Sequence, residues 1–115
     1  MALGLIRRGD IYLVNFAPAR NNEANNPRPA VVVTNNASNA QNVVITVVPT
    51  TTNVERVYHF QLLLPNQRTG LDSDSKAQVE QIRSVALSRV IRHLGQVPPD
   101  LMQELDEKIR LHLAL

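Results

Sequence analysis

The sequence predicts a mainly β domain ending in one helix: a small, strongly bent antiparallel sheet or partly closed barrel with the helix packed on it. Up to about residue 97, short segments of β-branched and aromatic residues alternate with turn-forming residues. From Pro99 onward the apolar residues recur every four positions, as in an amphipathic helix. A length of 115 residues with 43% hydrophobic residues suits one core, so we expect a single domain over residues 1–115.

The first predicted strand covers residues 9–16, because a turn-forming Gly-Asp pair precedes β-branched and aromatic residues. Three of its apolar side chains would share one face: Tyr12, Val14 and Phe16. Residues 17–27 contain four asparagines, two prolines and no large aliphatic residue, which predicts a long loop. Loops of this length often carry function.

Three further strands are each bounded by proline or asparagine. They are residues 30–34 after Pro29, residues 43–48 before Pro49, and residues 58–64 before Pro65. Residues 43–48 carry apolar side chains on both faces, which predicts a buried strand. The polar run 67–76, which includes Gly70, is predicted to be a turn or loop.

Residues 79–97 predict shorter elements. Val79, Ile82 and Val85 stand among polar residues and indicate a fifth strand. Residues 87–91 can form one helical turn, and residues 94–97 a last short strand.

The predicted C-terminal helix begins near Pro99, a residue that suits a first helical turn. Its apolar stripe consists of Leu101, Leu105, Ile109 and Leu113, with Met102 beside it. Two pairs four residues apart are expected to stabilise it, Glu104 with Lys108 and Asp106 with Arg110.

The basic residues are ten arginines and two lysines against ten acids, a formal net charge of +2. Because the planar guanidinium group forms paired hydrogen bonds, this preference for arginine favours recognition of phosphate or carboxylate. Residues 100–115 hold four acids and two bases, so residues 1–99 carry ten bases and six acids, or +4. The basic charge therefore belongs to the strand region.

Other counts exclude whole classes of protein. Without cysteine there is no disulfide framework, thiolate nucleophile or zinc knuckle. The longest apolar stretch, residues 43–48, is far shorter than the roughly 20 residues that span a bilayer, and the N-terminus lacks the order of a signal peptide. We therefore expect a cytoplasmic protein with no membrane segment.

Aromatic residues are scarce: Tyr12, Phe16, Tyr58 and Phe60. Four rings are too few for a surface that reads single-stranded nucleic acid chiefly by stacking. Any such binding is predicted to depend on guanidinium, amide and hydroxyl groups more than on stacking.

Several common sites are absent from the sequence. The four glycines form neither a dinucleotide fingerprint nor a phosphate loop, and there is no paired-histidine zinc motif. Asp72 and Asp74 fit a solvated acidic turn better than a metal site. The histidines lie in three separate elements and are interpreted as ordinary surface or half-buried residues: His59, His93 and His112. We therefore expect no metal site.

Two local features are candidates for chemistry. Arg28 stands between Pro27 and Pro29, which restrict the backbone on both sides and preorganise the cation. A surface arginine at the end of a loop explains the local sequence equally well. Thr50, Thr51 and Thr52 place three hydroxyls at a predicted strand end, where threonines commonly cap turns.

Five segments in order resemble the successive motifs of the MazF/PemK toxin family. They are residues 9–11 (Gly-Asp-Ile), a proline-bounded loop containing Glu23, residues 28–33 (Arg-Pro-Ala-Val-Val-Val), residues 48–52 (Val-Pro-Thr-Thr-Thr) and residues 80–84 (Glu-Gln-Ile-Arg-Ser). The resemblance runs from about Arg8 to Leu115. It implies a homodimeric, metal-independent endoribonuclease without a cofactor. It also implies an SH3-like barrel similar to plasmid-maintenance toxins, inhibited by a cognate MazE-like antitoxin.

The resemblance also implies an mRNA interferase that cleaves single-stranded RNA at short motifs. In the family the 2′-hydroxyl attacks the adjacent phosphate and leaves a cyclic phosphate and a 5′-hydroxyl. The catalytic arginine falls on Arg28 and the threonine on the triplet, with Thr51 as our choice. A fixed guanidinium can clamp the phosphate, and a hydroxyl can donate to the growing oxyanion. Because the pKa of arginine is roughly 12.5–13.8, Arg28 is a poor general base and is expected to stabilise negative charge on the phosphate. The identity of the general base does not follow from the sequence.

Further RNA contacts follow from the same resemblance. Glu23 and Gln81 are expected to hydrogen-bond base edges or the 2′-hydroxyl, and Arg83 is expected to contact RNA in the groove. Thr50 and Thr52 are expected to bind RNA beside Thr51. The family loop often reads Gly-Ser-Glu-Gln-Gly-Gly, whereas residues 21–26 here are Asn-Asn-Glu-Ala-Asn-Asn. The RNA motif that is cut therefore does not follow from the resemblance. Asn15 also stands where an aspartate is common in the family.

Two rival functions remain at this point. A non-enzymatic toxin of the same fold could poison a protein such as DNA gyrase through its C-terminal helix, without needing Arg28 and Thr51 together. A nucleic-acid-binding domain without catalysis is permitted by the +4 charge on residues 1–99. The presence of Arg28 and Thr51 in the family order favours the nuclease, and the scarcity of aromatic residues disfavours the binding domain.

Overall fold

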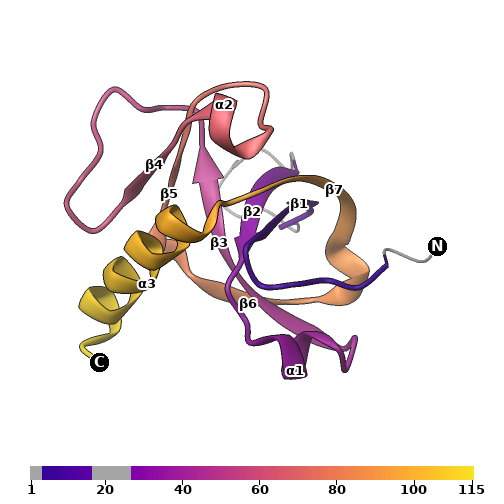
Figure 1. The fold of residues 1–115 in the computed structure, drawn as a ribbon. Helices are drawn as coiled ribbons and strands as arrows, with labels where there is room; N and C mark the ends of the chain where they lie inside the picture. The colour runs from indigo at the N-terminus through magenta and orange to yellow at the C-terminus, as the bar shows by residue number, and fades with distance from the viewer. Residues whose placement is uncertain (1–3, 17–26) are drawn as a thin grey trace.

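A computed structural model describes residues 4–16 and 27–115, and it has a curled antiparallel sheet with one long helix against it (Figure 1). The strands run in the order β4-β5-β3-β2-β1-β7, with β6 also paired to β3. Their bounds are β1 Asp10–Val14, β2 Arg28–Val32, β3 Val44–Thr51, β4 Leu62–Leu64, β5 Ser75–Ala77, β6 Arg83–Ala86 and β7 Val90–Gln96. The helix α3, Pro99–Leu113, closes the chain. The predicted fold class is confirmed.

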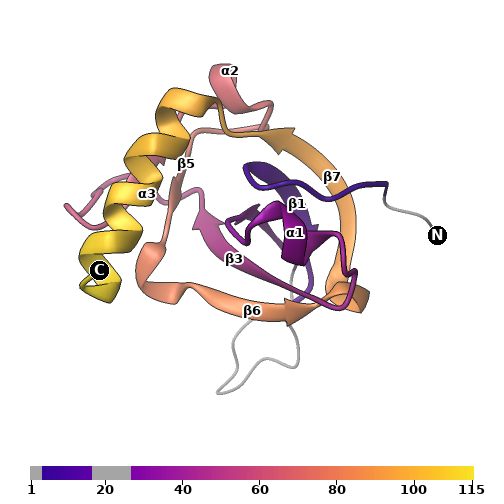
Figure 2. The same cartoon turned by 60° about the horizontal axis from the view of Figure 1, so that its bottom comes forward.

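The sheet curls because its central strand β3 serves different partners along its length (Figure 2). Residues 44–47 pair with β6, whereas Thr50 and Thr51 pair with β5. Pro49 lies between these two partners, where its missing N–H costs no ladder bond, and its carbonyl accepts the Gln78 N–H at 2.8 Å. The prediction that Pro49 ends this strand is therefore wrong.

The second strand begins earlier than predicted. β2 starts at Arg28, which pairs with Val14 of β1, and it ends at Val32. Pro29 is accommodated inside the strand, where it pairs with Leu13. Arg28 is therefore a strand residue and not the last residue of a loop.

Several short elements differ from the prediction because long-range pairing decides them. The predicted strand 58–64 is reduced to β4, and a turn closed by the Gln61 N–H to Tyr58 carbonyl bond precedes it. The predicted loop 67–76 contains most of a short helix, residues 66–69, and the start of β5. The short helices are α1 Asn36–Asn39, α2 Asn66–Thr69, and the 3-10 turns η1 Val79–Gln81 and η2 Leu87–Arg89.

The last two strands also differ in their bounds. The predicted fifth strand is a 3-10 turn followed by β6, and the final strand β7 begins at Val90 rather than near Leu94. The turn predicted over residues 87–91 is confirmed as η2.

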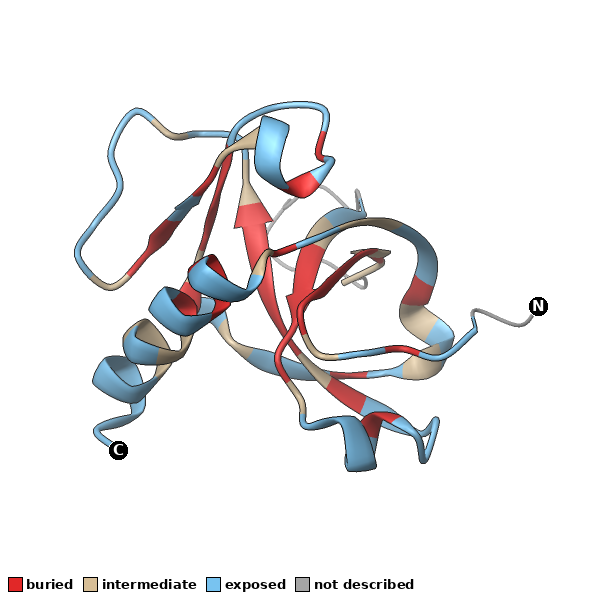
Figure 3. Ribbon diagram, in the orientation of Figure 1, coloured by how far each residue is buried: buried red, intermediate tan, exposed pale blue. Residues whose placement is uncertain are grey.

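Two hydrophobic clusters lie on opposite faces of the sheet. Figure 3 shows buried residues along the central strands and at the start of the long helix. The helix-side cluster packs Ile11, Val31 and Val48 against α3. The opposite-face cluster is built from the alternate strand positions, among them Tyr12, Val14, Ala30, Val32 and Val47, with Phe16 against it. The shared face predicted for Tyr12, Val14 and Phe16 is confirmed.

The packing of α3 against the sheet decreases toward its C-terminus. Leu101, Met102 and Leu105 are buried, Ile109 is half-buried, and Leu113 is exposed. The predicted apolar stripe is therefore correct in its first three turns, and its last member faces solvent.

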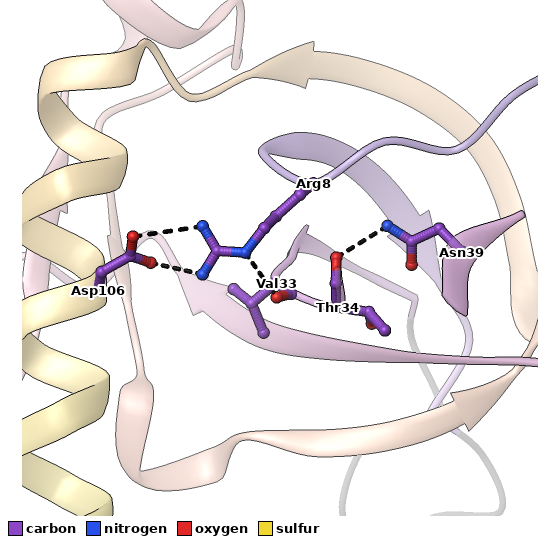
Figure 4. A network of polar contacts seen from close by, with 5 residues as sticks. All are labelled: Arg8, Val33, Thr34, Asn39 and Asp106. Carbon is purple, nitrogen blue, oxygen red and sulfur yellow. Dashed lines mark hydrogen bonds and ion pairs between the residues drawn. The ribbon is translucent and has the colours of Figure 1, made fainter. Parts of the chain in front are cut away.

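Arg8 joins the N-terminal segment, the end of β2 and α3 (Figure 4). Its guanidinium donates to both carboxylate oxygens of Asp106, at 2.5 and 3.3 Å, and to the Val33 carbonyl at 2.8 Å. Because Asp106 pairs across the fold, the predicted pair with Arg110 is wrong. Lys108 likewise donates to the His59 carbonyl at 2.6 Å rather than pairing with Glu104. In the part of the chain that the structure describes, no helix is long and apolar enough to cross a bilayer.

Candidate functional site

Arg28 and Thr51 are brought together by the register of β2 and β3. The ladder pairs Ala30 with Pro49 and Val31 with Val48. Continued by two residues, the same register sets Arg28 opposite Thr51. Residues directly opposite in an antiparallel pair have Cβ atoms about 4.5–5.5 Å apart and side chains on the same face. Two candidates that are 23 positions apart in sequence therefore lie at the neighbouring ends of β2 and β3, which the Thr50 hydroxyl joins through its bond to the Pro29 carbonyl.

A third polar residue extends this pair into a row. Thr51 pairs with Lys76 of β5 on its other side. The row therefore reads Arg28, Thr51, Lys76 across three neighbouring strands, with a cation on each side of the hydroxyl. We call these three residues the cationic row.

Within residues 4–16 and 27–115, Arg28 is positioned by its backbone rather than by contacts of its side chain. Its main chain is held between Val14 on β1 and the end of β3, and prolines precede and follow it. Since proline fixes its own φ and restricts the residue before it, the direction of the Arg28 side chain is preset. The side chain itself is exposed, so its guanidinium is available to a ligand.

The threonine triplet divides by strand alternation. Thr50 is buried, and its hydroxyl donates to the Pro29 carbonyl at 2.9 Å. Thr51 is half-buried, and its Oγ1 accepts the Asn53 N–H at 3.3 Å, which leaves the hydroxyl hydrogen free to donate. Thr52 is exposed. The geometry therefore favours Thr51 as the reacting threonine and gives Thr50 an inward, anchoring hydrogen bond.

Lys76 is the functional candidate that the sequence did not indicate. Its side chain is 93% buried, and its Nζ donates to the Arg56 carbonyl at 2.5 Å. A buried ammonium group is costly unless it is hydrogen-bonded. The sequence offered no signal for Lys76, because residues 67–76 read as a polar loop and its burial depends on the distant segment 52–61.

Arg83 lies on the same face as the cationic row but farther along. It pairs with Val47, four residues before Thr51, a separation of about 13 Å along the strand. Its guanidinium carbon is 5.2 Å from the centre of the Phe16 ring. Phe16 follows Val14, the partner of Arg28, by two residues, so the Arg83 side chain extends toward the end of β1 next to Arg28.

The remaining predicted RNA contacts are less closely placed. Gln81 is exposed at the end of η1, where its N–H bonds the Gln78 carbonyl at 2.9 Å. Glu23 lies outside the described residues.

The chemistry of the cationic row is electrostatic. Two cations and a hydroxyl donor suit a phosphate and an oxyanion that develops on it.

His93 lies away from the cationic row, 3.7 Å from Asp10 and edge-on to Tyr12. Burial, and then the charge of Asp10, raise the pKa of Tyr12 above its usual value of 10.0. Among residues 4–16 and 27–115, no group of three histidine or carboxylate side chains is placed to hold a metal.

A broad depression of about 720 Å³ lies away from the cationic row, between α2, β7 and the start of α3. Arg8 and Arg68 line it, but each is paired with a carboxylate, Asp106 and Asp100 respectively. Both arginines that line the depression are thus paired with carboxylates, whereas Arg28 of the cationic row is exposed.

Comparisons with known proteins agree on one family. Residues 7–113 match the family described as PemK-like, MazF-like toxin of type II toxin-antitoxin system. The chain is 51% identical to Endoribonuclease MazF9 of Mycobacterium tuberculosis over 116 residues, which cover 96% of this chain and 98% of that protein.

Solved structures share the fold. MazF from Deinococcus radiodurans superposes with a TM-score of 0.80 at 24% identity, covering 97% of this chain and 99% of that one. An endoribonuclease from a mycobacterial species in complex with its cognate antitoxin superposes with a TM-score of 0.76 at 20% identity, covering 96% of each chain.

Proposed function

The chain belongs to the PemK-like, MazF-like family of type II toxins, and we infer from this premise that it is an endoribonuclease toxin neutralised by a cognate antitoxin. The observation that carries the catalytic assignment is the register of β2 and β3, which, continued two residues beyond its last pair, Ala30 with Pro49, directs Arg28 and Thr51 toward each other. The family order and the register point to the same two residues.

In the proposed reaction the 2′-hydroxyl of one nucleotide attacks the adjacent phosphorus. The new P–O bond closes a 2′,3′-cyclic phosphate, and the bond to the next 5′-oxygen breaks to release a 5′-hydroxyl. Arg28 binds the phosphate oxygens and stabilises the charge that grows on them, while Thr51 donates its hydroxyl hydrogen to the same oxyanion. Lys76, on the far side of Thr51, adds positive potential at this point.

The substrate is single-stranded RNA, and its neighbouring nucleotides meet polar side chains around the row. Gln81 and Glu23 are proposed to contact base edges or the 2′-hydroxyl, and Arg83 and Thr52 to contact the backbone. Thr50 contributes indirectly, because its hydroxyl is bonded to Pro29 inside the protein.

We further propose that the whole chain, residues 1–115, acts as one domain in a cytoplasmic homodimer. A relative of the same fold has been solved in complex with its cognate antitoxin. An acidic, flexible inhibitory segment suits the basic strand region and would compete there with RNA.

The test is digestion of a long single-stranded RNA in excess EDTA, followed by analysis of the product ends. We expect cleavage to continue and to yield cyclic phosphate and 5′-hydroxyl ends. Intact RNA, or products with 5′-phosphate ends, would contradict the proposal. A gyrase-dependent DNA-break assay run in parallel distinguishes the rival function, which predicts DNA breaks while the RNA stays intact.

A further inference from the structure

Two of the four aromatic side chains form a stack in the segment that connects β3 to β4. The Tyr58 and Phe60 rings lie 5.5 Å apart and are inclined by only 8°. This spacing is that of an offset-stacked pair. Tyr58 is 44% exposed, so the stack reaches the surface.

Two cations flank the same stack. The guanidinium carbon of Arg56 lies 5.5 Å from the centre of the Tyr58 ring, and the Nζ of Lys76 lies 5.6 Å from it. Guanidinium groups stack on aromatic faces and, on their other side, on nucleobases. We call Arg56, Tyr58 and Phe60 the stacking platform.

The stacking platform is joined to the cationic row by one side chain. Lys76 stands opposite Thr51 on the sheet, and its Nζ donates to the Arg56 carbonyl at 2.5 Å. The stacking platform therefore lies about one lysine side chain away from the Thr51 hydroxyl.

The platform is also held in place before any ligand arrives. The side chain of Gln61 accepts the Tyr58 N–H at 3.1 Å and donates to Glu80 at 2.8 Å, which ties the segment to η1. Lys108 of α3 donates to the His59 carbonyl at 2.6 Å. Because these contacts tie the segment to η1 and to α3, little ordering entropy is lost when a ligand binds.

We propose that the stacking platform binds a nucleobase of the RNA next to the cleaved phosphate, a role that rests on the proposed RNA-cleaving function. The base extends the stack at its exposed side, Arg56 binds the adjacent phosphate, and the buried Lys76 adds positive potential from below. This placement revises the expectation that stacking contributes little, since half of the few aromatic residues gather beside the row.

The chemistry favours RNA over a protein partner at this surface. Exposed rings interleaved with cations match a ligand that alternates flat bases with anionic phosphates. An apolar protein surface would leave the exposed Arg56 without complementary charge.

The experiment uses the natural fluorescence of the chain. The protein has two tyrosines and no tryptophan, and Tyr12 is buried, so a ligand that quenches tyrosine emission by stacking reports on Tyr58. The probe is a mixed-sequence single-stranded RNA with every ribose 2′-O-methylated, which cannot undergo 2′-hydroxyl attack. We expect it to quench the wild-type emission. The affinity of each variant is measured by the fluorescence anisotropy of the same RNA carrying a 5′ dye: Tyr58→Ala should weaken binding about tenfold, whereas Tyr58→Phe should lose the quenching signal and keep the affinity.

The control is Val57→Ala, which alters the neighbouring exposed side chain and should leave the probe affinity unchanged. Equal affinity of Tyr58→Ala and wild type would overturn the proposal, as would a Tyr58→Ala variant that loses affinity only for the antitoxin. Failure of the proposed function is recognised separately, because it would abolish cleavage of unmodified RNA by the wild type while the quenching persists.

Discussion

The hydroxyl of Thr50 donates to the carbonyl of Pro29 at 2.9 Å, and this bond locks together the two strand ends that carry Thr51 and Arg28. Each of the bonded residues is the direct neighbour of a proposed catalytic residue. A buried hydrogen bond between the neighbouring residues thus helps to fix the relative position of Arg28 and Thr51. Adjacent threonines consequently have separable roles, one structural and one chemical.

Removing the two hydroxyls one at a time tests this division. Thr51→Val should lower the RNA cleavage rate by about 100-fold, because it removes one donor to the oxyanion, with little change in stability. Thr50→Val should cost about 1 kcal/mol of the free energy of unfolding, because it removes a buried hydrogen bond, and should retain most of the activity of the folded enzyme. Cleavage kinetics and thermal melts measure both. The opposite pattern, activity lost with Thr50 and kept without Thr51, would refute the assignment.

The ion pair between Arg8 and Asp106 is predicted to hold α3 on the sheet. Asp106→Asn should lower the free energy of unfolding by about 1 kcal/mol, since the pair is bidentate but one-third exposed. Urea denaturation followed by circular dichroism measures the loss. Glu107→Gln, an exposed neighbour on the same helix, is the control and should change stability by less than about 0.5 kcal/mol. Equal stability of the two variants would show that the Arg8 pair contributes nothing.

The elements predicted correctly from sequence are those whose pattern is local. The helix α3 is marked by its four-residue apolar repeat, and β1 by its alternation after a turn. The prediction that Pro49 ends the strand is wrong because β3 can contain a proline at the point where its partner changes from β6 to β5. That point is set by tertiary pairing and not by the local sequence. The three-residue strand β5 has no β-branched or aromatic residue, so only its pairing with β3 and β4 defines it.

A close backbone contact makes Gly95 sensitive to substitution. A Cβ at this position would lie 2.0 Å from the carbonyl oxygen of Thr69, at the end of α2. Gly95→Ala must displace backbone and should cost about 3 kcal/mol, which lowers the melting temperature by roughly 10 °C or more. Gln96→Ala, at the next and exposed position, should melt close to the wild type. Calorimetry of the two variants measures the difference. Equal melting temperatures would show that the backbone at Gly95 and Thr69 moves apart at little cost.

The ion pair between Arg68 and Asp100 predicts a pH-dependent contribution to stability. The hydrogen bond from Arg68 holds the pKa of Asp100 below its usual value of 3.8. A carboxyl group with a lowered pKa stabilises the fold above its unfolded pKa, and this contribution disappears as the pH falls through the folded value. The melting temperature of Asp100→Asn should therefore lie slightly below the wild type at pH 7, and the gap should begin to close as the pH falls below about 4. A gap that stays constant across this range would exclude the ion pair as its cause.

The candidate site was predictable only in part. Arg28 and Thr51 follow from the family resemblance, and the structure adds that the register of β2 and β3 places them at neighbouring strand ends. Lys76 could not be predicted, since its burial requires the Arg56 carbonyl from a segment 20 residues away. The gathering of Tyr58 and Phe60 beside Lys76 was equally hidden, because a count of aromatic residues carries no information about their clustering.

The most direct test of the catalytic assignment is the rate at which Arg28→Ala cleaves single-stranded RNA in EDTA, measured on protein whose melting temperature matches the wild type. Arg28 is exposed, so its removal should leave the fold intact while the cleavage rate falls at least about 100-fold. Arg28→Lys should recover part of the rate, since it restores the charge without the bidentate fork. A folded Arg28→Ala protein that cleaves RNA at the wild-type rate would contradict the catalytic role of Arg28.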